Sequence, residues 1–434
     1  MTDSASFKNA NAKAANLEML PDTRRWTVPA LVAVVIGALL SAKVWSEDQS
    51  VLLGGYLNAW LCLLEVVLGL HVLRWLNNLT GGAWGKPLRL YSAAARPLLL
   101  LAAILFVPIA LNLPAIYEWA NPASASDPII AKKRLYLNVE AFQIRAVVYF
   151  AGWLLLDLWI RALERRALRD PSEPNERKVR MRSAQALLFY GLSMTFGSVD
   201  WAMSLEPHWY SAAYGVIAVI GQGLAAIAFT ALLTARKERQ EEFAHPELAA
   251  AAHKPDARHH HPGHRGAKDH DTHHPTLLQD LGNLMLAFTM LFTYTSFSQY
   301  LIIWFGDLPE EVVWYVHRFE HGWQCVAAGL LAFHFALPFV ALLPRGVKRN
   351  PRAMTIIASW ILFMRWLDGV WKVGPAFHAS AAAGYGAGAT LLAYAGPGLL
   401  MAGLFALLMA WLLPRQAEIV EIAYGSRSGR EAHA

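Results

Sequence analysis

Charged residues and cysteines are both scarce in this sequence. Only 16% of the 434 residues are charged, whereas soluble domains average about 25%. The two cysteines, Cys62 and Cys325, lie inside apolar segments and belong to no CxxC or CxxCH motif. The sequence therefore offers no disulfide framework and no support for c-type haem attachment or a zinc site. We expect the chain to bind no metal. The net charge of +6 does not indicate nucleic acid, because the basic residues lie in short connections between apolar segments.

Apolar residues dominate instead. They make up 56% of the chain, with 17 Trp and 19 Phe, and Trp is enriched where helices meet the membrane surface. About ten segments approach the roughly 20 apolar residues that cross a bilayer. They cover residues 27–45, 51–73, 94–116, 137–160, 183–204, 209–234, 277–305, 312–343, 353–371 and 391–413. The sequence predicts an all-α polytopic membrane protein whose first segment is a retained helix, because it is too long for a signal-peptide core.

The eighth segment is too long for one crossing. About 32 residues at a 1.5 Å rise exceed a hydrocarbon core of about 30 Å. We expect its first turns to project beyond the membrane, or Pro338 to bend it.

Lys and Arg are distributed unevenly between the two sides of the predicted bundle. About 30 lie on the side that holds both termini and about five on the other. The five are Lys43, Lys132, Lys133, Arg134 and Lys372. Basic residues collect on the cytoplasmic side, so we predict a bacterial inner-membrane protein with both termini in the cytoplasm.

Short motifs recur at an offset of four segments. Asp200 precedes Pro207 by seven residues at the end of the fifth segment, and Asp368 precedes Pro375 in the same way in the ninth. An even offset makes the repeats parallel. We infer four-helix units at residues 51–207 and 208–375, flanked by helices at 27–46 and 391–413. Tails at 1–26 and 414–434 and a connection at 235–276 are predicted to be cytoplasmic. Nine of the 16 His lie in that connection, whose composition is typical of a disordered loop.

Ionisable side chains inside membrane segments are costly and are the first candidates for function. The candidates for a proton path are Asp200, Asp368, His317, His321, Glu320, Glu65, His334, Arg365, Asp157, Asp280 and His71. We expect Asp200 and Asp368 to be a repeat-related pair that lines a polar path near the outer side, within reach of His317, His321, Arg318 or Gln299.

A structural role is the alternative for several of these groups. Arg365 can pair with an Asp, and Arg145 with Glu140 or Glu320, and such pairs hold helices together without moving protons. Asp280, Asp157 and His71 lie near segment ends, where snorkelling accounts for them.

The stretch HRFEH, His317 to His321, is predicted to place two His on one helical face. It is not HExxH and has no third ligand, so a metal site is not expected. His71 and His334 lie at different depths, so they do not provide the facing pair that a bis-His haem requires.

Two long motifs carry a family resemblance. SVDWAMSLEPHWYS begins at Ser198, and YTSFSQYLIIWFGDLP begins at Tyr294. With the ten segments and the parallel repeat, they resemble the NrfD-like family of membrane subunits, which includes the polysulfide reductase membrane subunit. Within it the chain is most similar to the second, shorter NrfD-like subunit of alternative complex III. The resemblance covers the membrane segments but not the tails or the His-rich connection.

The resemblance implies a subunit without a redox centre in a quinol-oxidising complex. Its partners would be a larger NrfD-like paralogue, an iron–sulfur subunit and haem c subunits, together with quinone and lipid. It also implies a quinol pocket near the outer face and polar residues suited to proton movement. The candidates for that pocket are Gln299, Arg318, Gln143 and Arg145. The resemblance leaves open whether this copy binds quinone, because the larger paralogue is the one expected to hold the working site.

Two other classes of protein compete with this interpretation. A stand-alone secondary transporter would suit parallel repeats with ionisable groups near the membrane midplane. Transporters usually break helices at the binding site, and no matching pair of segments interrupted by Gly or Pro is evident. A cytochrome b-like haem protein is disfavoured by the histidine positions.

Overall fold

The computed structural model describes residues 23–244, 276–378 and 386–431. Residues 1–22 of the predicted N-terminal tail and residues 245–275 of the predicted connection, which include all nine of its His, lie outside these residues. Within them the chain is helical and has no β-strand, which confirms the predicted all-α fold.

Long helices make up most of the chain. They are α2 (Arg24–Glu47), α3 (Gln49–Thr80), α4 (Lys86–Leu105), α8 (Val139–Arg169), α9 (Glu173–Trp201), α10 (Tyr214–Ala244), α12 (Leu277–Gly306), α17 (Pro351–His378) and α18 (Ala387–Glu431). Shorter α-helices are α5 (Val107–Leu111), α6 (Leu113–Ile116), α7 (Pro128–Lys133), α13 (Pro309–Val316), α14 (Trp323–Gly329), α15 (Leu337–Leu342) and α16 (Arg345–Arg349). A π-helical turn, η5 (Leu330–Ala336), joins α14 to α15, and short 3₁₀ turns lie at Ala83–Gly85, Glu118–Ala120, Pro122–Ser124 and Met203–Leu205.

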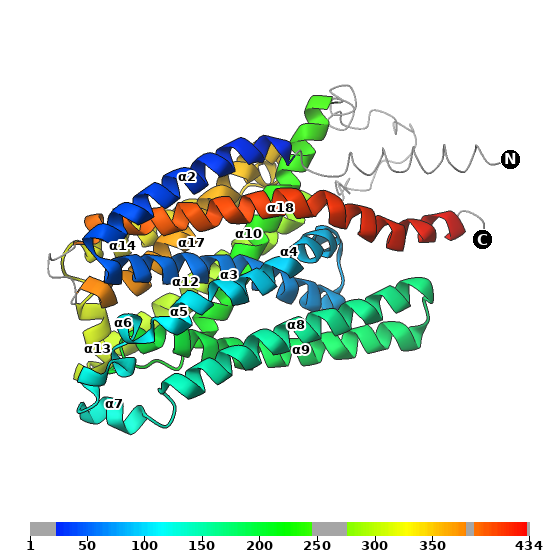
Figure 1. The fold of residues 1–434 in the computed structure, drawn as a ribbon. Coiled ribbons are helices and arrows are strands. Elements are labelled where there is room, and N and C mark those ends of the chain that lie inside the picture. Colours follow the sequence, from blue (N-terminus) through cyan, green and yellow to red (C-terminus); the bar gives the residue numbers. More distant parts are fainter. Residues whose placement is uncertain (1–22, 245–275, 379–385, 432–434) are drawn as a thin grey trace.

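Nine helical segments in the described part of the chain are long and apolar enough to cross a membrane. The predicted fifth segment is not among them, although it forms α9, which has 29 residues and packs along α8 (Figure 1). Its buried side carries small polar groups such as Ser193 and Ser198, together with Asp200, which lower its hydropathy. The protein is therefore a multi-pass membrane protein.

Side chains at the helix starts fix several boundaries. The Asp48 carboxylate accepts hydrogen bonds from the backbone N–H groups of Ser50 and Val51. Asn138 caps α8, and Thr276 caps α12. These groups satisfy N–H groups that have no partner within the helix. The helices therefore begin where local sequence offers an acceptor.

The helices that fall in the first predicted unit are α3, α4, α8 and α9, and those in the second are α10, α12, α14 to α15 and α17. The two sets pack against each other and share one hydrophobic core. Helix α3 joins them, because it packs against both α10 and α17. Helices α2 and α18 lie side by side along the bundle, as Figure 1 shows in blue and red. At Gly37 they approach so closely that a Cβ would lie 2.4 Å from the backbone nitrogen of Leu400. The internal repeat itself stays a prediction.

Two segments differ from their predicted form. The third begins at Lys86 and ends in the short helices α5 and α6 rather than running unbroken from residue 94 to 116. The long eighth segment is divided, so that α13 forms a separate helix and the crossing itself is Trp323–Leu342. Its first turns are thus not part of the candidate crossing, and that they project beyond the membrane stays a prediction. We call the end of the bundle that holds α6, α7 and α13 the α13 end (Figure 1).

The prediction that HRFEH forms one helical face is wrong. His317 to Gly322 form turns between α13 and α14. His321 has φ +50° and Gly322 has φ +90°, a left-handed conformation that ends a right-handed helix and that glycine adopts most readily. The two His therefore do not lie one turn apart on a common face.

Candidate functional site

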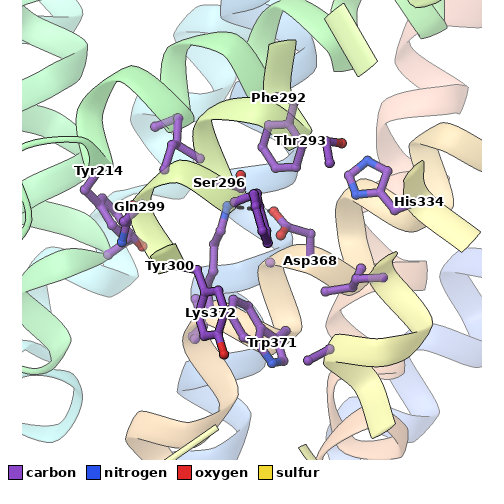
Figure 2. A pocket seen from close by; sticks show the side chains of 18 of the residues that line it. Tyr214, Phe292, Thr293, Ser296, Gln299, Tyr300, His334, Asp368, Trp371 and Lys372 are labelled. Atoms are coloured by element: carbon purple, nitrogen blue, oxygen red, sulfur yellow. Dashed lines mark hydrogen bonds and ion pairs between the residues drawn. The ribbon is translucent and has the colours of Figure 1, made fainter. Parts of the chain in front are cut away.

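A cavity of about 470 Å³ lies between the helices of the second unit and two helices of the first unit, α3 and α9, which supply part of its wall. It extends from Trp314 and Tyr315 at the α13 end to Glu65, near the middle of α3. Most of its wall is apolar or aromatic, including Phe292, Tyr300, Trp371 and the rings at the α13 end (Figure 2). Cavities with apolar walls and a few convergent polar groups are the usual form of small-molecule sites.

A chain of four charges follows one wall of the cavity. Arg365 donates to Glu65 at 2.7 Å and to Asp368 at 2.8 Å, and Lys372 donates to Asp368 at 2.7 Å. Arg365, Asp368 and Lys372 follow one side of α17 at spacings of three and four residues, whereas Glu65 comes from α3. Figure 2 shows Lys372 reaching Asp368 at the centre of the site. Two cations and two carboxylates neutralise one another, so the cluster carries no net charge.

Several neutral polar groups of the cavity lining have no partner among the described residues. They are both amide atoms of Asn58, Ser296 Oγ, His334 Nε2 and Trp371 Nε1, and all of these atoms are buried. A buried polar group without a hydrogen bond costs roughly 1–3 kcal/mol. Their gathering around one cavity indicates a place where a polar molecule would be hydrogen bonded.

The π-helical turn carries His334 to the cavity. The histidine ring lies 5.2 Å from the ring of Phe292, and Figure 2 shows the two beside each other. π-Helical turns are rare and frequently occur at functional sites. The break in the helix thus places a buried imidazole beside the charge chain.

Asp200 lies in a different environment from Asp368. Arg145 donates to both its oxygens, at 2.8 and 2.9 Å, and Tyr149 donates to one of them at 3.0 Å. Asp200 does not line the cavity within the described part of the chain. Arg145 also stacks on Tyr136. The expected pairing of Arg145 with Glu140 or Glu320 is therefore wrong, and Asp200 contacts none of the groups that we expected near it. Gln143 is exposed and donates to the Ala110 carbonyl.

Asp157 and His71 belong to an ion network near the opposite end. Asp157 accepts from Arg161 at 2.8 Å and from Arg96 at 3.0 Å, and it lies 2.9 Å from His71 Nδ1. Arg74 pairs with Glu164 nearby. The network links α3, α4 and α8. Asp280 lies in the first turn of α12, where a carboxylate interacts favourably with the helix dipole.

At the α13 end, a buried arginine connects the two units. Arg318 donates to Glu206 at 2.8 Å and to the Lys372 carbonyl at 2.7 Å, and it stacks on Trp314. His317 lies 3.3 Å from the other Glu206 oxygen. That hydrogen bond raises the pKa of His317. Burial acts to raise the pKa of Glu206, but the charges of Arg318 and His317 and the hydrogen bonds from both residues together outweigh it, so the pKa is lowered. His321 and Glu320 lie 3.8 Å apart and are exposed.

The structure brings together some of the predicted residues and adds others. Glu65, His334, Arg365, Asp368 and Gln299 all border the cavity or its charge chain. Asn58, Ser296 and Lys372 were not singled out from the sequence. The sequence argument selected ionisable residues inside membrane segments. Asn58 and Ser296 are neutral, so it could not select them. Lys372 lies just beyond the predicted end of its segment, so it was counted as a loop residue. In the described residues no group of three or more His, Cys, Asp or Glu side chains could hold a metal ion.

The fold and the cavity define the class of this protein. It is a multi-pass α-helical membrane protein with a largely apolar internal site and a neutralised charge chain in its wall. Neither protein-family models nor a search of curated proteins gives a match to the chain.

Proposed function

We propose that this chain is a membrane subunit without a redox centre in a quinol-oxidising complex of the alternative complex III type. The observation that carries the proposal is the cavity with its unpaired amide, hydroxyl, imidazole and indole groups. A quinone headgroup is flat, apolar on its faces and polar at two opposite oxygens, which suits aromatic walls with a few polar contacts. The two long motifs similar to NrfD-like subunits also support it.

The residues of this chain would bind and orient the headgroup. Ser296 and Trp371 can donate hydrogen bonds to ring oxygens, and His334 Nε2 can donate or accept according to its tautomer. Glu65 and Asp368 line the same cavity. They are therefore the candidates for the first carboxylates of a proton path that starts at the headgroup. Electrons would leave through iron–sulfur and haem c subunits, beside a larger NrfD-like paralogue.

The proposed orientation follows from the basic residues. With both termini in the cytoplasm of a bacterium, the α13 end faces the periplasm. The cavity would then lie in the outer half of the inner membrane, as expected for a quinol site that delivers electrons outward.

A stand-alone secondary transporter is the second candidate. The observation that favours it is the broken eighth segment, because transporters interrupt helices at binding sites near the midplane. The same charge chain would then serve a coupled ion rather than a quinol.

Gentle purification of the tagged protein separates the two. We expect co-purification of haem c and iron–sulfur subunits, and quinone in an organic extract of the complex. The variant Ser296→Phe should lose the quinone, whereas the control Ser298→Phe, two residues along α12 and outside the cavity lining, should retain it. A colourless protein without partner subunits or quinone would favour the transporter.

A further inference from the structure

The cavity has an apolar mouth between α12 and the divided eighth segment. The most exposed large hydrophobic residues of its lining are Leu331 at 61%, Phe297 at 55% and Phe319 at 44%. Gln324 and Ala328 of α14 also line it and are exposed. These residues lie on α12 or between the end of α13 and the π-helical turn, so the mouth opens between those two elements.

The mouth lies within the length of the helices that crosses the membrane. Phe297 belongs to the span Leu277–Gly306, and Ala328 and Leu331 belong to the span Trp323–Leu342. Side chains around the rim are also apolar and exposed, such as Tyr294 and Ile302 on α12. Acyl chains rather than water therefore face the opening.

Small residues keep the mouth wide. Ala327, Ala328 and Gly329 follow one another where α14 meets the π-helical turn, and a Cβ built on Gly329 meets no described atom within 4 Å. A hydrocarbon chain can lie against such a surface without displacing protein side chains.

The interior beyond the mouth suits a polar group without charge. The two cations and two carboxylates of the wall are paired with one another, so an additional ion would be buried without a counter-charge, which is strongly unfavourable. The unpaired atoms belong to an amide, a hydroxyl, an imidazole and an indole. Together they can both donate to and accept from a neutral head.

We propose that the cavity is entered sideways from the bilayer by an amphiphile whose uncharged head reaches Ser296 and His334 while its hydrocarbon tail stays in the mouth between α12 and α14. The proposal rests on the proposed function in one respect, since a tailed quinone is the amphiphile used to test it. It adds the route of entry, the position of the tail and the exclusion of charged heads.

Three probes test this on the full-length protein in lipid nanodiscs. They are a decyl-substituted benzoquinone, the same ring without the tail, and decyl sulfate. The variant Ala328→Trp fills the mouth, and the control Ala332→Trp adds the same side chain at an exposed position outside the cavity lining. We expect Ala328→Trp to weaken decyl-quinone binding at least tenfold and to change binding of the tail-less ring less than twofold. Ala332→Trp should match the wild type, and decyl sulfate should not displace the quinone.

A decyl-benzoquinone that carries a photoreactive group at the end of its tail gives a second readout. This readout uses the wild-type protein alone, so it does not depend on whether a variant folds. In the wild type the photoreactive group should label Phe297, Ala328 or Leu331. Labels elsewhere, equal loss of both quinones in Ala328→Trp, or displacement by decyl sulfate would overturn the proposal. If the wild type bound neither quinone, the ligand assigned under the proposed function would fail. If it bound both and the mouth variant did not distinguish them, only the sideways entry would fail.

Discussion

The two predicted four-helix units have different interiors. In the first unit, aromatic rings pack against one another, with the Trp60 and Trp201 ring centres 5.0 Å apart and those of Phe150 and Trp153 5.4 Å apart. All four residues are buried. In the second unit, rings such as Phe292 and Trp371 line a cavity instead. Asp200 therefore lies beside a packed core, whereas Asp368 borders the cavity.

This difference separates stabilising groups from groups available to a ligand. In the first unit, Trp60 donates to the Ala102 carbonyl and Trp153 to Ser193 Oγ. Side-chain polar atoms without a partner in the described part of the chain occur in both units, and Trp201 Nε1 is one of them, but those of Ser296, His334 and Trp371 border the cavity. We therefore assign Asp200 chiefly to stability and Asp368 to function, although the sequence predicts equal roles for them.

The largest expected effect comes from removing a large side chain from the packed interior of the first unit. Trp201→Ala should lower the free energy of unfolding by about 3–5 kcal/mol, because a fully buried indole leaves a cavity. Tyr300→Ala, which removes a half-buried ring from a cavity wall, should cost about 1 kcal/mol. Thermal unfolding in mild detergent measures both, and equal losses would contradict the contrast between the units.

A smaller difference is expected between the two carboxylates. Asp200→Asn removes the carboxylate that Arg145 contacts with two nitrogens, and breaking a buried pair costs about 3–5 kcal/mol as an upper bound. Asp368→Asn leaves Arg365 paired with Glu65, and Lys372, which loses its carboxylate partner, borders the cavity, so the loss should be about half as large.

Their functional effects should run the other way. In the purified complex, Asp368→Asn should reduce quinol oxidation at least tenfold, while the Asp200→Asn protein that does assemble should retain more than half. The exposed Asp170→Asn serves as the control. Normal turnover in Asp368→Asn, or a selective loss of turnover in well-assembled Asp200→Asn, would reverse the assignment.

The smallest expected effect concerns the link between the units at the α13 end. The pKa of His317 is raised by Glu206, so their ion pair stabilises the fold fully below the ordinary His pKa of about 6.5 and less as pH rises through the raised value. The lowered pKa of Glu206 keeps its charge down to pH values below about 4. Because His317 is 53% exposed, the pair is worth no more than about 1 kcal/mol.

The test is a double-mutant cycle of His317→Gln and Glu206→Gln, in which the melting temperature of each variant is measured. The coupling between the two positions should be measurable at pH 6 and should vanish by about pH 9. A coupling that grew with pH would contradict the ion pair, and Arg318 would then be the only charged contact of Glu206.

Local sequence predicted the helices well because hydropathy and capping act over short distances. Apolar segments lie within α2, α3 and α18, although α18 continues to Glu431, and the excess length before Trp323 correctly indicated that the eighth segment is not one crossing. The same local reasoning failed at HRFEH, since a run without Gly or Pro gives no sign that His321 adopts a positive φ. Gly322 was the available signal.

The sequence by itself determined that this chain is a bundle of membrane-crossing helices, because runs of apolar residues and the placement of Lys and Arg depend little on neighbouring helices. Only the tertiary structure decided which charges meet. Glu65 and Arg365 are 300 positions apart, and their contact depends on the rotation and depth of α3 and α17. Likewise, rings of the second unit such as Phe292 and Trp371 line the cavity, whereas Trp60 and Trp201 of the first unit pack into the core beside it. Packing between helices sets such differences, and hydropathy along one helix does not record them.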